Sequence, residues 1–289
     1  MVSRAVHIEV SKSHDTSSFI NALRRFLAIR GPISVLRCDR GTNFVGANRE
    51  LKEAIENVND DVLRNFLNEH NCEIEFKHNV PDASHMGGVW ERMIRSVRSI
   101  LNVLMANHSE QLDDEMLRTY MYEVMAIINS RPLTTETLND PTSLTPLTPN
   151  HLIMMKSNVV LPPPGEFQRD DVYCRKRWRR VQYLIDQFWC RWKKEYLQTI
   201  QERQKWTRKR RNVQVGDVVL LKDDSLPRNS WPLCKVVKAN TSCDNLVRTV
   251  KLQIGNPNLT HNGKRIGKVS YLERPVHKVI VLIENNDNK

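Results

Sequence analysis

The sequence lacks the features that mark several broad classes of protein. No apolar run approaches the roughly 18 residues that a membrane span needs, and the N-terminal residues have no apolar core like that of a secretory signal. The six cysteines form no CxxC pair, which argues against a zinc ribbon and against a disulfide framework. We therefore expect a soluble, intracellular protein with reduced thiols and no membrane partner.

Acidic residues are scarce in one part of the chain. The net charge is +11, and residues 175–211 hold 14 Lys and Arg against three acids, which equals the surplus of the whole chain. A basic segment of that density indicates a polyanion partner, most simply nucleic acid. The alternative is a basic helix whose charges are only solvated.

Hydrophobic periodicity divides the chain into three parts. Strand and helix signals alternate up to about residue 130, which predicts an α/β fold with a partly parallel sheet. The seven prolines between residues 131 and 170 interrupt regular structure, and short strands follow Val213. The predicted parts are an α/β domain at 1–155, a Pro-rich connector with a basic helix at 156–212, and a small β-barrel at 213–284.

The α/β part contains clear strand and helix signals. Strands are predicted at 5–10, 33–38 and 73–76. Helices are predicted to begin at Asp15, near Asn48, at Val89, and at Asp113 or Asp114.

The basic segment is itself predicted to be a helix with an apolar face. Apolar residues recur at intervals of three and four, so one face is aromatic and the other cationic. These residues are Trp178, Val181, Ile185, Phe188, Trp192 and Tyr196. A stripe at helical spacing favours a packing surface over a base-stacking platform.

Two carboxylates occupy positions suited to metal-dependent chemistry. Asp39 follows a predicted strand, at the carboxyl edge of a sheet, and Glu91 begins a helix after Gly87-Gly88. Converging carboxylates can hold two divalent cations that activate a hydroxyl and stabilise the leaving oxygen of a phosphodiester. Both residues also have structural explanations. The helix dipole stabilises an acid in the first turn by about 0.3–1 kcal/mol, and an Asp near glycine is a common turn residue.

The segments around these carboxylates carry a resemblance to a known family. Cys38–Phe44 (CDRGTNF) and Ser84–Arg92 (SHMGGVWER) closely resemble the integrase core of Pao/BEL-type LTR retrotransposons. The same family is matched at residues 4–10, 129–134 and 147–152. The domain that follows the integrase core in those polyproteins resembles residues 177–206, 216–219, 227–233 and 273–276.

The resemblance implies a ribonuclease H-like α/β core that lacks its first strand, followed by a long basic helix and a small SH3-like β-barrel. In that family, two aspartates and a glutamate bind two metal ions for 3′-end processing and strand transfer. Asp39 matches the second aspartate and Glu91 the glutamate, so Mg²⁺ or Mn²⁺ is the expected cofactor. DNA is the expected partner, with a homo-oligomer as a further one, and the nucleus is the expected location.

The predicted nucleic-acid contacts are cations on the two arginine-rich helices and in the segment after the second one. They are Arg92, Arg95, Arg98, Arg177, Arg179, Arg180, Lys193, Lys194, Arg208, Lys209, Arg210 and Arg211.

The match fails at three points. The family's first aspartate precedes the segment matched by Arg4–Val10, so we expect it to be absent here, and Asp15 fits a helix N-cap better than a metal ligand. Arg40 stands where the family usually has Asn, and a cation beside Asp39 competes with Mg²⁺. The family's zinc-binding N-terminal module has no counterpart among the His and Cys residues.

Three hypotheses follow. The first is an integrase-derived chain that binds DNA but performs no strand transfer. The second is a non-enzymatic nucleic-acid-binding protein that uses the basic helix and the barrel, with binding that falls steeply with salt. The third is a multimerisation fragment held by the aromatic face of the helix at residues 178–196.

Overall fold

The computed structural model describes residues 3–38, 45–51, 75–78, 88–108, 112–135, 146–154, 162–200, 211–223, 226, 228–254 and 269–285. The chain forms two compact units, a smaller one of residues 7–95 and a larger one of residues 1–6 with 96–289. None of the helices in these ranges is both long and apolar enough to cross a membrane. The cysteines that fall within them are free thiols.

The smaller unit contains the parallel strand pair that the sequence predicts. Helix α1 (Thr16–Arg30) begins at its N-cap Asp15, whose carboxylate accepts the Ser18 N–H at 2.6 Å, and ends at Gly31, which has φ 88°. Strand β1 (Val35–Cys38) then pairs in parallel with β2 (Glu75–His78). Residues 45–51 are helical. Helix α4 (Gly88–His108) begins in this unit and ends in the larger one.

Residues 5–10 were predicted to be a strand, and the structure shows none there. The side chain of Asn129 accounts for part of the difference. Its Oδ1 accepts the Val6 N–H at 2.8 Å, and its Nδ2 donates to the Val6 carbonyl at 2.7 Å. One amide side chain thereby occupies the two backbone groups through which a neighbouring strand would pair with Val6.

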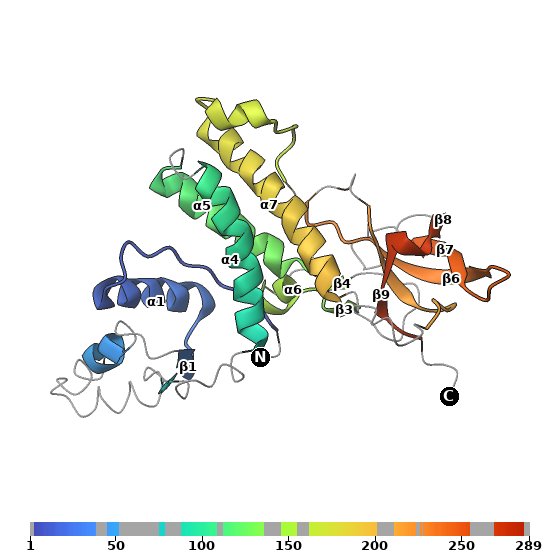
Figure 1. The fold of residues 1–289 in the computed structure, drawn as a ribbon. Coiled ribbons are helices and arrows are strands. Elements are labelled where there is room, and N and C mark those ends of the chain that lie inside the picture. The colour runs from blue at the N-terminus through green and yellow to red at the C-terminus, as the bar shows by residue number, and fades with distance from the viewer. Residues whose placement is uncertain are drawn as a thin grey trace. The chain divides into compact units, whose positions relative to one another are not determined.

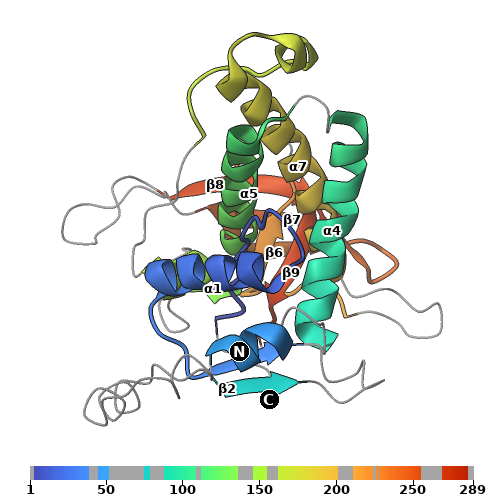
Figure 2. The same ribbon diagram turned by 90° about the vertical axis from the view of Figure 1, so that its left-hand side faces the viewer.

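Helices α5 and α7 form the centre of the larger unit and lie side by side (Figures 1 and 2). Helix α5 (Asp114–Asn129) is capped by Asp113, which accepts the Met116 N–H at 2.8 Å. Helix α7 (Arg177–Ile200) follows the 3-10 turn η3 (Arg169–Tyr173). The short elements β3 (Thr134–Thr135), β4 (Pro146–Leu147) and α6 (Pro149–Met154) lie between α5 and η3 in the sequence.

The aromatic face of α7 is a packing surface, as predicted. Phe188 and Trp192 are at most 1% exposed, and their rings stack at a centroid distance of 6.3 Å. Tyr196 extends the stack at 5.9 Å from Trp192, and Tyr120 of α5 meets Phe188 edge-on at 6.5 Å. Only the first member of the stripe departs from this pattern, because Trp178 is 49% exposed.

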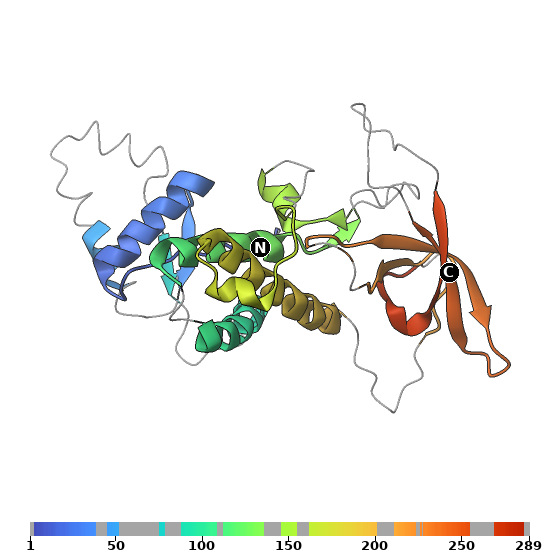
Figure 3. The same ribbon diagram turned by 90° about the horizontal axis from the view of Figure 1, so that it is seen from above.

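The C-terminal part of the larger unit is a five-stranded antiparallel sheet in the order β8-β7-β6-β5-β9. Its elements are β5 (Val218–Leu221), β6 (Leu233–Thr241), β7 (Val247–Ile254), β8 (Ser270–Pro275), the 3-10 turn η4 (Val276–Lys278) and β9 (Val279–Ile283). Figure 3 shows the orange hairpin of β6 and β7 from above. Among the described strands, β8 and β9 are the two edges and do not pair with each other.

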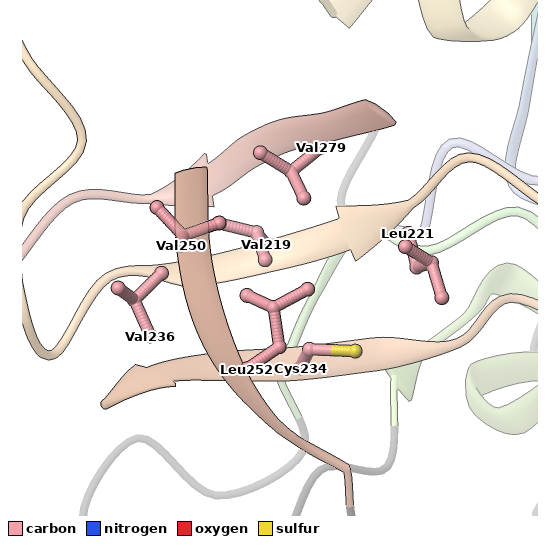
Figure 4. Close-up of a cluster of buried hydrophobic side chains, with 7 residues drawn as sticks. All are labelled: Val219, Leu221, Cys234, Val236, Val250, Leu252 and Val279. Carbon is pink, nitrogen blue, oxygen red and sulfur yellow. The ribbon is translucent and has the colours of Figure 1, made fainter. Parts of the chain in front are cut away.

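Alternate residues of these strands build a core on one face of the sheet. Figure 4 shows the cluster: Val219, Leu221, Cys234, Val236, Val250, Leu252 and Val279. Burial raises the pKa of the Cys234 thiol to about 12, so this cysteine packs as a small apolar side chain and is not a reactive thiolate.

Candidate functional site

Of the two predicted metal ligands, the structure describes one. Glu91 lies in the first turn of α4 and is half-buried. Asp39 lies outside the described residues, although the parallel strand β1 ends at Cys38, immediately before it. Within the described ranges, no group of three or more His, Cys, Asp or Glu side chains could hold a metal ion. A single described carboxylate does not form a two-metal site.

The predicted cations of α4 are at the surface where the structure describes their side chains. Arg95 and Arg98 are exposed and follow Glu91 at intervals of four and seven residues, so the three lie on one face of the helix. Arg92 belongs to α4, but the structure does not describe its side chain.

The predicted cations at the start of α7 form contacts within the protein. Arg179 binds both carboxylate oxygens of Asp171, at 2.7 and 3.1 Å, and this hydrogen bonding lowers the pKa of the Asp171 carboxyl. Arg180 donates to the Cys174 carbonyl at 3.2 Å, and Arg177 pairs with Asp113 at 3.0 Å. These contacts fasten α7 to η3 and to the N-terminus of α5.

Lys193 is buried and Lys194 is exposed, although the two are neighbours in the sequence. Lys193 is 8% exposed; its Nζ donates to the Asp223 carbonyl at 2.9 Å and lies 5.8 Å from the centre of the Trp189 ring. Lys194 is exposed. The helical repeat places Lys193 one turn after the buried Trp189, whereas Lys194 lies on the far side of the helix.

Arg211 is bound to a buried carboxylate. The Asp217 side chain is 0% exposed and accepts hydrogen bonds from the Arg211 guanidinium at 2.9 Å and from the backbone N–H groups of Gln214 and Asn285 at 2.8 and 2.9 Å. Asp217 therefore joins the segment that enters the sheet to the segment that leaves it. Arg208, Lys209 and Arg210 lie outside the described residues.

The Asn129-Ser130-Arg131-Pro132 segment connects several parts of the larger unit, a role that the sequence alone did not reveal. The Arg131 guanidinium is 2% exposed and donates to the carbonyls of Ile128 and Arg4. The Pro132 carbonyl accepts the Tyr196 hydroxyl at 2.5 Å. Burial raises the pKa of Tyr196 to about 12, so this donor keeps its proton at neutral pH.

Arg228 is a second buried cation, and no pattern in the sequence indicates its role. It is 4% exposed and forms ion pairs with Asp186 of α7 at 3.0 Å and Glu123 of α5 at 3.4 Å. It also donates to the Gln182 side-chain oxygen at 2.5 Å, and Gln182 donates to Glu123 at 2.6 Å. The loop at residues 228–231 is thereby fixed to both helices.

Trp231 completes this attachment. Its ring meets Trp189 and Tyr196 of α7 edge-on, at 5.1 and 5.4 Å, and its Nε1 donates to the Ser130 hydroxyl at 3.3 Å. The loop that precedes β6 and helix α7 therefore share a cluster of aromatic side chains.

Helices α4 and α7 meet in the larger unit, and each has exposed cations near the residues that meet. The Ser99 hydroxyl of α4 donates to the Glu195 carboxylate of α7 at 3.5 Å, so the two helices are in contact there. Arg98 precedes Ser99, and Lys194 precedes Glu195; both are exposed. Arg191, one turn before Glu195, is exposed as well and was not among the predicted contacts. Its position opposite the apolar stripe could have identified it.

Comparisons with known proteins give limited matches. The comparison with curated proteins finds none. One matching solved structure is described as "CryoEM structure of simian T-cell lymphotropic virus intasome in complex with PP2A regulatory subunit B56 gamma"; the identity is 12%, the TM-score 0.30, and the match covers 94% of this chain and 66% of that one. A likeness at that TM-score assigns neither fold nor function. Residues 176–282, from α7 through most of the sheet, match a family described as "Family of unknown function (DUF5641)".

Proposed function

We propose that the protein binds nucleic acid through the exposed cations where α4 contacts α7, and that it derives from a Pao/BEL-type integrase. One observation carries the proposal. The aromatic face of α7 is buried, which leaves Arg191 and Lys194 exposed, and Arg98 is exposed on α4 next to Ser99, the residue that contacts Glu195 of α7. Exposed cations that form no ion pair with the described residues are available to a phosphate backbone. Glu195 is the one acid at this contact, and it accepts from Ser99.

The surroundings make α7 a firm support for these cations. Arg179, Lys193 and Arg228 fix the helix to η3, to Asp223 and to the loop at residues 228–231. A helix held at both ends and along its buried face keeps Arg191 and Lys194 at a constant spacing, which lowers the entropic cost of binding.

The proposal includes the fold classes expected from the resemblance. The parallel pair β1–β2 supports a ribonuclease H-like core. The strand order β8-β7-β6-β5-β9, with η4 between the last two strands, supports an SH3-like barrel.

The metal site of the parent family remains a separate proposal, in which Asp39 and Glu91 hold Mg²⁺ or Mn²⁺. The end of β1 at Cys38 and the position of Glu91 in the first turn of α4 favour it. When bound, such ions activate a water or a 3′-hydroxyl for attack on a phosphodiester. Arg40, which follows Asp39 in the sequence, competes with a bound cation, so we propose nucleic-acid binding without strand transfer.

The first prediction concerns salt dependence. The full chain should bind a fluorescent 20-base-pair DNA duplex with an affinity that falls steeply as salt rises. The double variant Arg191→Ala/Lys194→Ala should lower the slope of log affinity against log salt by about 1 for each cation removed. Arg248→Ala is the control, because Arg248 is an exposed cation paired with Asp244. An unchanged slope in the double variant would contradict the proposed interface.

The second prediction separates binding from catalysis. Glu91→Gln should leave duplex binding unchanged, because Glu91 is not one of the proposed phosphate contacts. With Mg²⁺ or Mn²⁺ present, the wild-type chain should not join a donor DNA end to a target, as followed on a sequencing gel. Joining by the wild type that Glu91→Gln abolishes would instead establish an integrase.

A further inference from the structure

We propose that the outer face of strands β6, β7 and β8 binds a single-stranded segment of nucleic acid, with one base stacked on Tyr271 and phosphates held by Lys235, Lys238 and Lys251. This inference rests on the proposed function, but it places a second contact surface on the sheet, apart from the cations of α4 and α7.

The strand register brings these residues together. Across the sheet, Lys235 of β6 lies opposite Gln253 of β7, which lies opposite Tyr271 of β8. In the next row, Lys238 lies opposite Lys251, which lies opposite Glu273. Val236, Val250 and Leu252 alternate with them and point into the core. The polar residues therefore share the opposite face.

Tyr271 is available to a ligand. It is 58% exposed, and the Lys251 Nζ lies 5.4 Å from the centre of its ring. A large aromatic side chain at the surface, with a cation over one face of its ring, offers both a stacking partner for a base on the other face and a charge for the adjoining phosphate.

The lysines have an unfavourable arrangement in the free protein. Like charges directly opposite each other on neighbouring strands destabilise a sheet, and Lys238 and Lys251 are such a pair. None of the three lysines forms an ion pair with the residues that the structure describes. Glu273 is the one acid in these two rows, and it accepts from the Asn240 side chain at 2.9 Å. A bound polyanion would relieve the repulsion that remains.

A single strand fits this surface better than a duplex does. In a duplex, neighbouring base pairs cover both faces of each base, whereas an unpaired base can lie flat on an exposed ring. The pleated face of the sheet also presents Tyr271 on the edge strand β8, with the lysines of β7 and β6 to one side of it.

The test measures binding of fluorescent dT12 and of the 20-base-pair duplex to the full chain by anisotropy. Tyr271→Ala should weaken dT12 binding on the order of 10-fold, Tyr271→Phe should retain it, and Lys238→Ala should reduce its salt slope by about 1. Tyr173→Ala is the matched control, because Tyr173 is also a highly exposed tyrosine, at 71%, but lies in η3. Circular dichroism confirms that each variant folds.

The outcomes separate this inference from the proposed function. Loss of dT12 binding in Tyr271→Ala, with duplex binding kept, supports the inference. If Tyr271→Ala and Lys238→Ala bind dT12 like the wild type while Arg191→Ala/Lys194→Ala loses duplex binding, the inference is wrong and the proposed function stands. Equal competition by polyglutamate would identify an acidic protein as the ligand and also overturn the inference. No binding of either DNA by the wild type would refute both.

Discussion

Replacing Asp217 with alanine should destabilise the five-stranded sheet by about 3 kcal/mol, the low end of the range for removing one partner of a buried ion pair, because the Arg211 side chain that remains is 31% exposed. The variant loses the acceptor for three donors, namely the Arg211 guanidinium and the N–H groups of Gln214 and Asn285. The carboxylate is 0% exposed, so water does not screen these bonds in the wild type. For a sheet of this size, the loss corresponds to a fall in melting temperature of more than about 10 °C.

Hydrogen–deuterium exchange of the full chain, followed by mass spectrometry, provides the measurement, because a protein with two units does not unfold in a single step. Peptides from β6 and β7 should exchange much faster in Asp217→Ala, whereas peptides from α1 should not change. Asp244→Ala is the control, because Asp244 is an acid near the surface that pairs with Arg248 in the turn between β6 and β7. Unchanged protection of β6 and β7 in Asp217→Ala would refute a structural role for this carboxylate.

Asp217 also illustrates what the sequence could not reveal. Gly216-Asp217 was identified only as part of a motif at the start of a strand, and Arg211 was assigned to nucleic acid because it ends a basic run. The Asp217 carboxylate that binds Arg211 also accepts the backbone N–H of Asn285, 68 residues further along the chain. Gly216 has φ 95°, and a Cβ there would lie 2.2 Å from the Asn285 side chain. Contacts this distant in sequence leave no periodic signal.

Local patterns were predictable where one element determines them. The caps of α1 and α5, the parallel strand β1 and the buried stripe of α7 all follow from spacing and residue type. Residues 5–10 have the alternation of a strand, but at Val6 an Asn side chain from α5 replaces a neighbouring strand. The residues of this segment alone could not predict that Asn129, more than 100 residues away, would bond to Val6.

The predicted cations of the candidate site also divide into those that local spacing explains and those whose contacts lie in other segments of the chain. A count of charges assigned Arg179 and Lys193 to nucleic acid together with Lys194, but the first two bind Asp171 and the Asp223 carbonyl. The helical repeat would have separated Lys193, one turn from Trp189, from Arg191 and Lys194 on the solvent face. Metal binding by Asp39 and Glu91 is a prediction. Nucleic-acid binding by the exposed cations is a prediction as well.

The second large effect is expected at Arg228. Replacing it with alanine removes the cation between Asp186 and Glu123 and should cost about 3 kcal/mol. We expect the low end of the usual range because these carboxylates are 34% and 35% exposed, so water partly solvates them once the arginine is gone. Exchange in α7 and in the loop at residues 228–231 should rise, since both lose their common anchor.

The loss of folding stability in Arg228→Ala, relative to the wild type, should also depend on pH. Burial raises the pKa of Asp186, and Arg228 opposes that shift by attraction. Without Arg228 the pKa of Asp186 should rise further. A carboxyl whose pKa is higher in the folded state stabilises the fold at low pH and loses that contribution as pH rises through the folded pKa. The difference in stability from the wild type should therefore be largest near pH 7 and shrink as the pH falls, because protonation neutralises the Asp186 carboxylate that Arg228 had neutralised.

A double-mutant cycle identifies the source of this effect. Adding Asp186→Asn to Arg228→Ala should recover part of the lost stability at pH 7 and flatten its pH dependence, because one of the two unpaired carboxylates is then absent. Arg274→Ala is the control, since this arginine bonds only the Glu273 carbonyl among the contacts that the structure describes. If Arg228→Ala were equally destabilised at every pH, lost packing of the arginine stem would be the cause and the ion pairs would contribute nothing. The pH profile thus distinguishes an electrostatic connection between the helices and the sheet from a steric one.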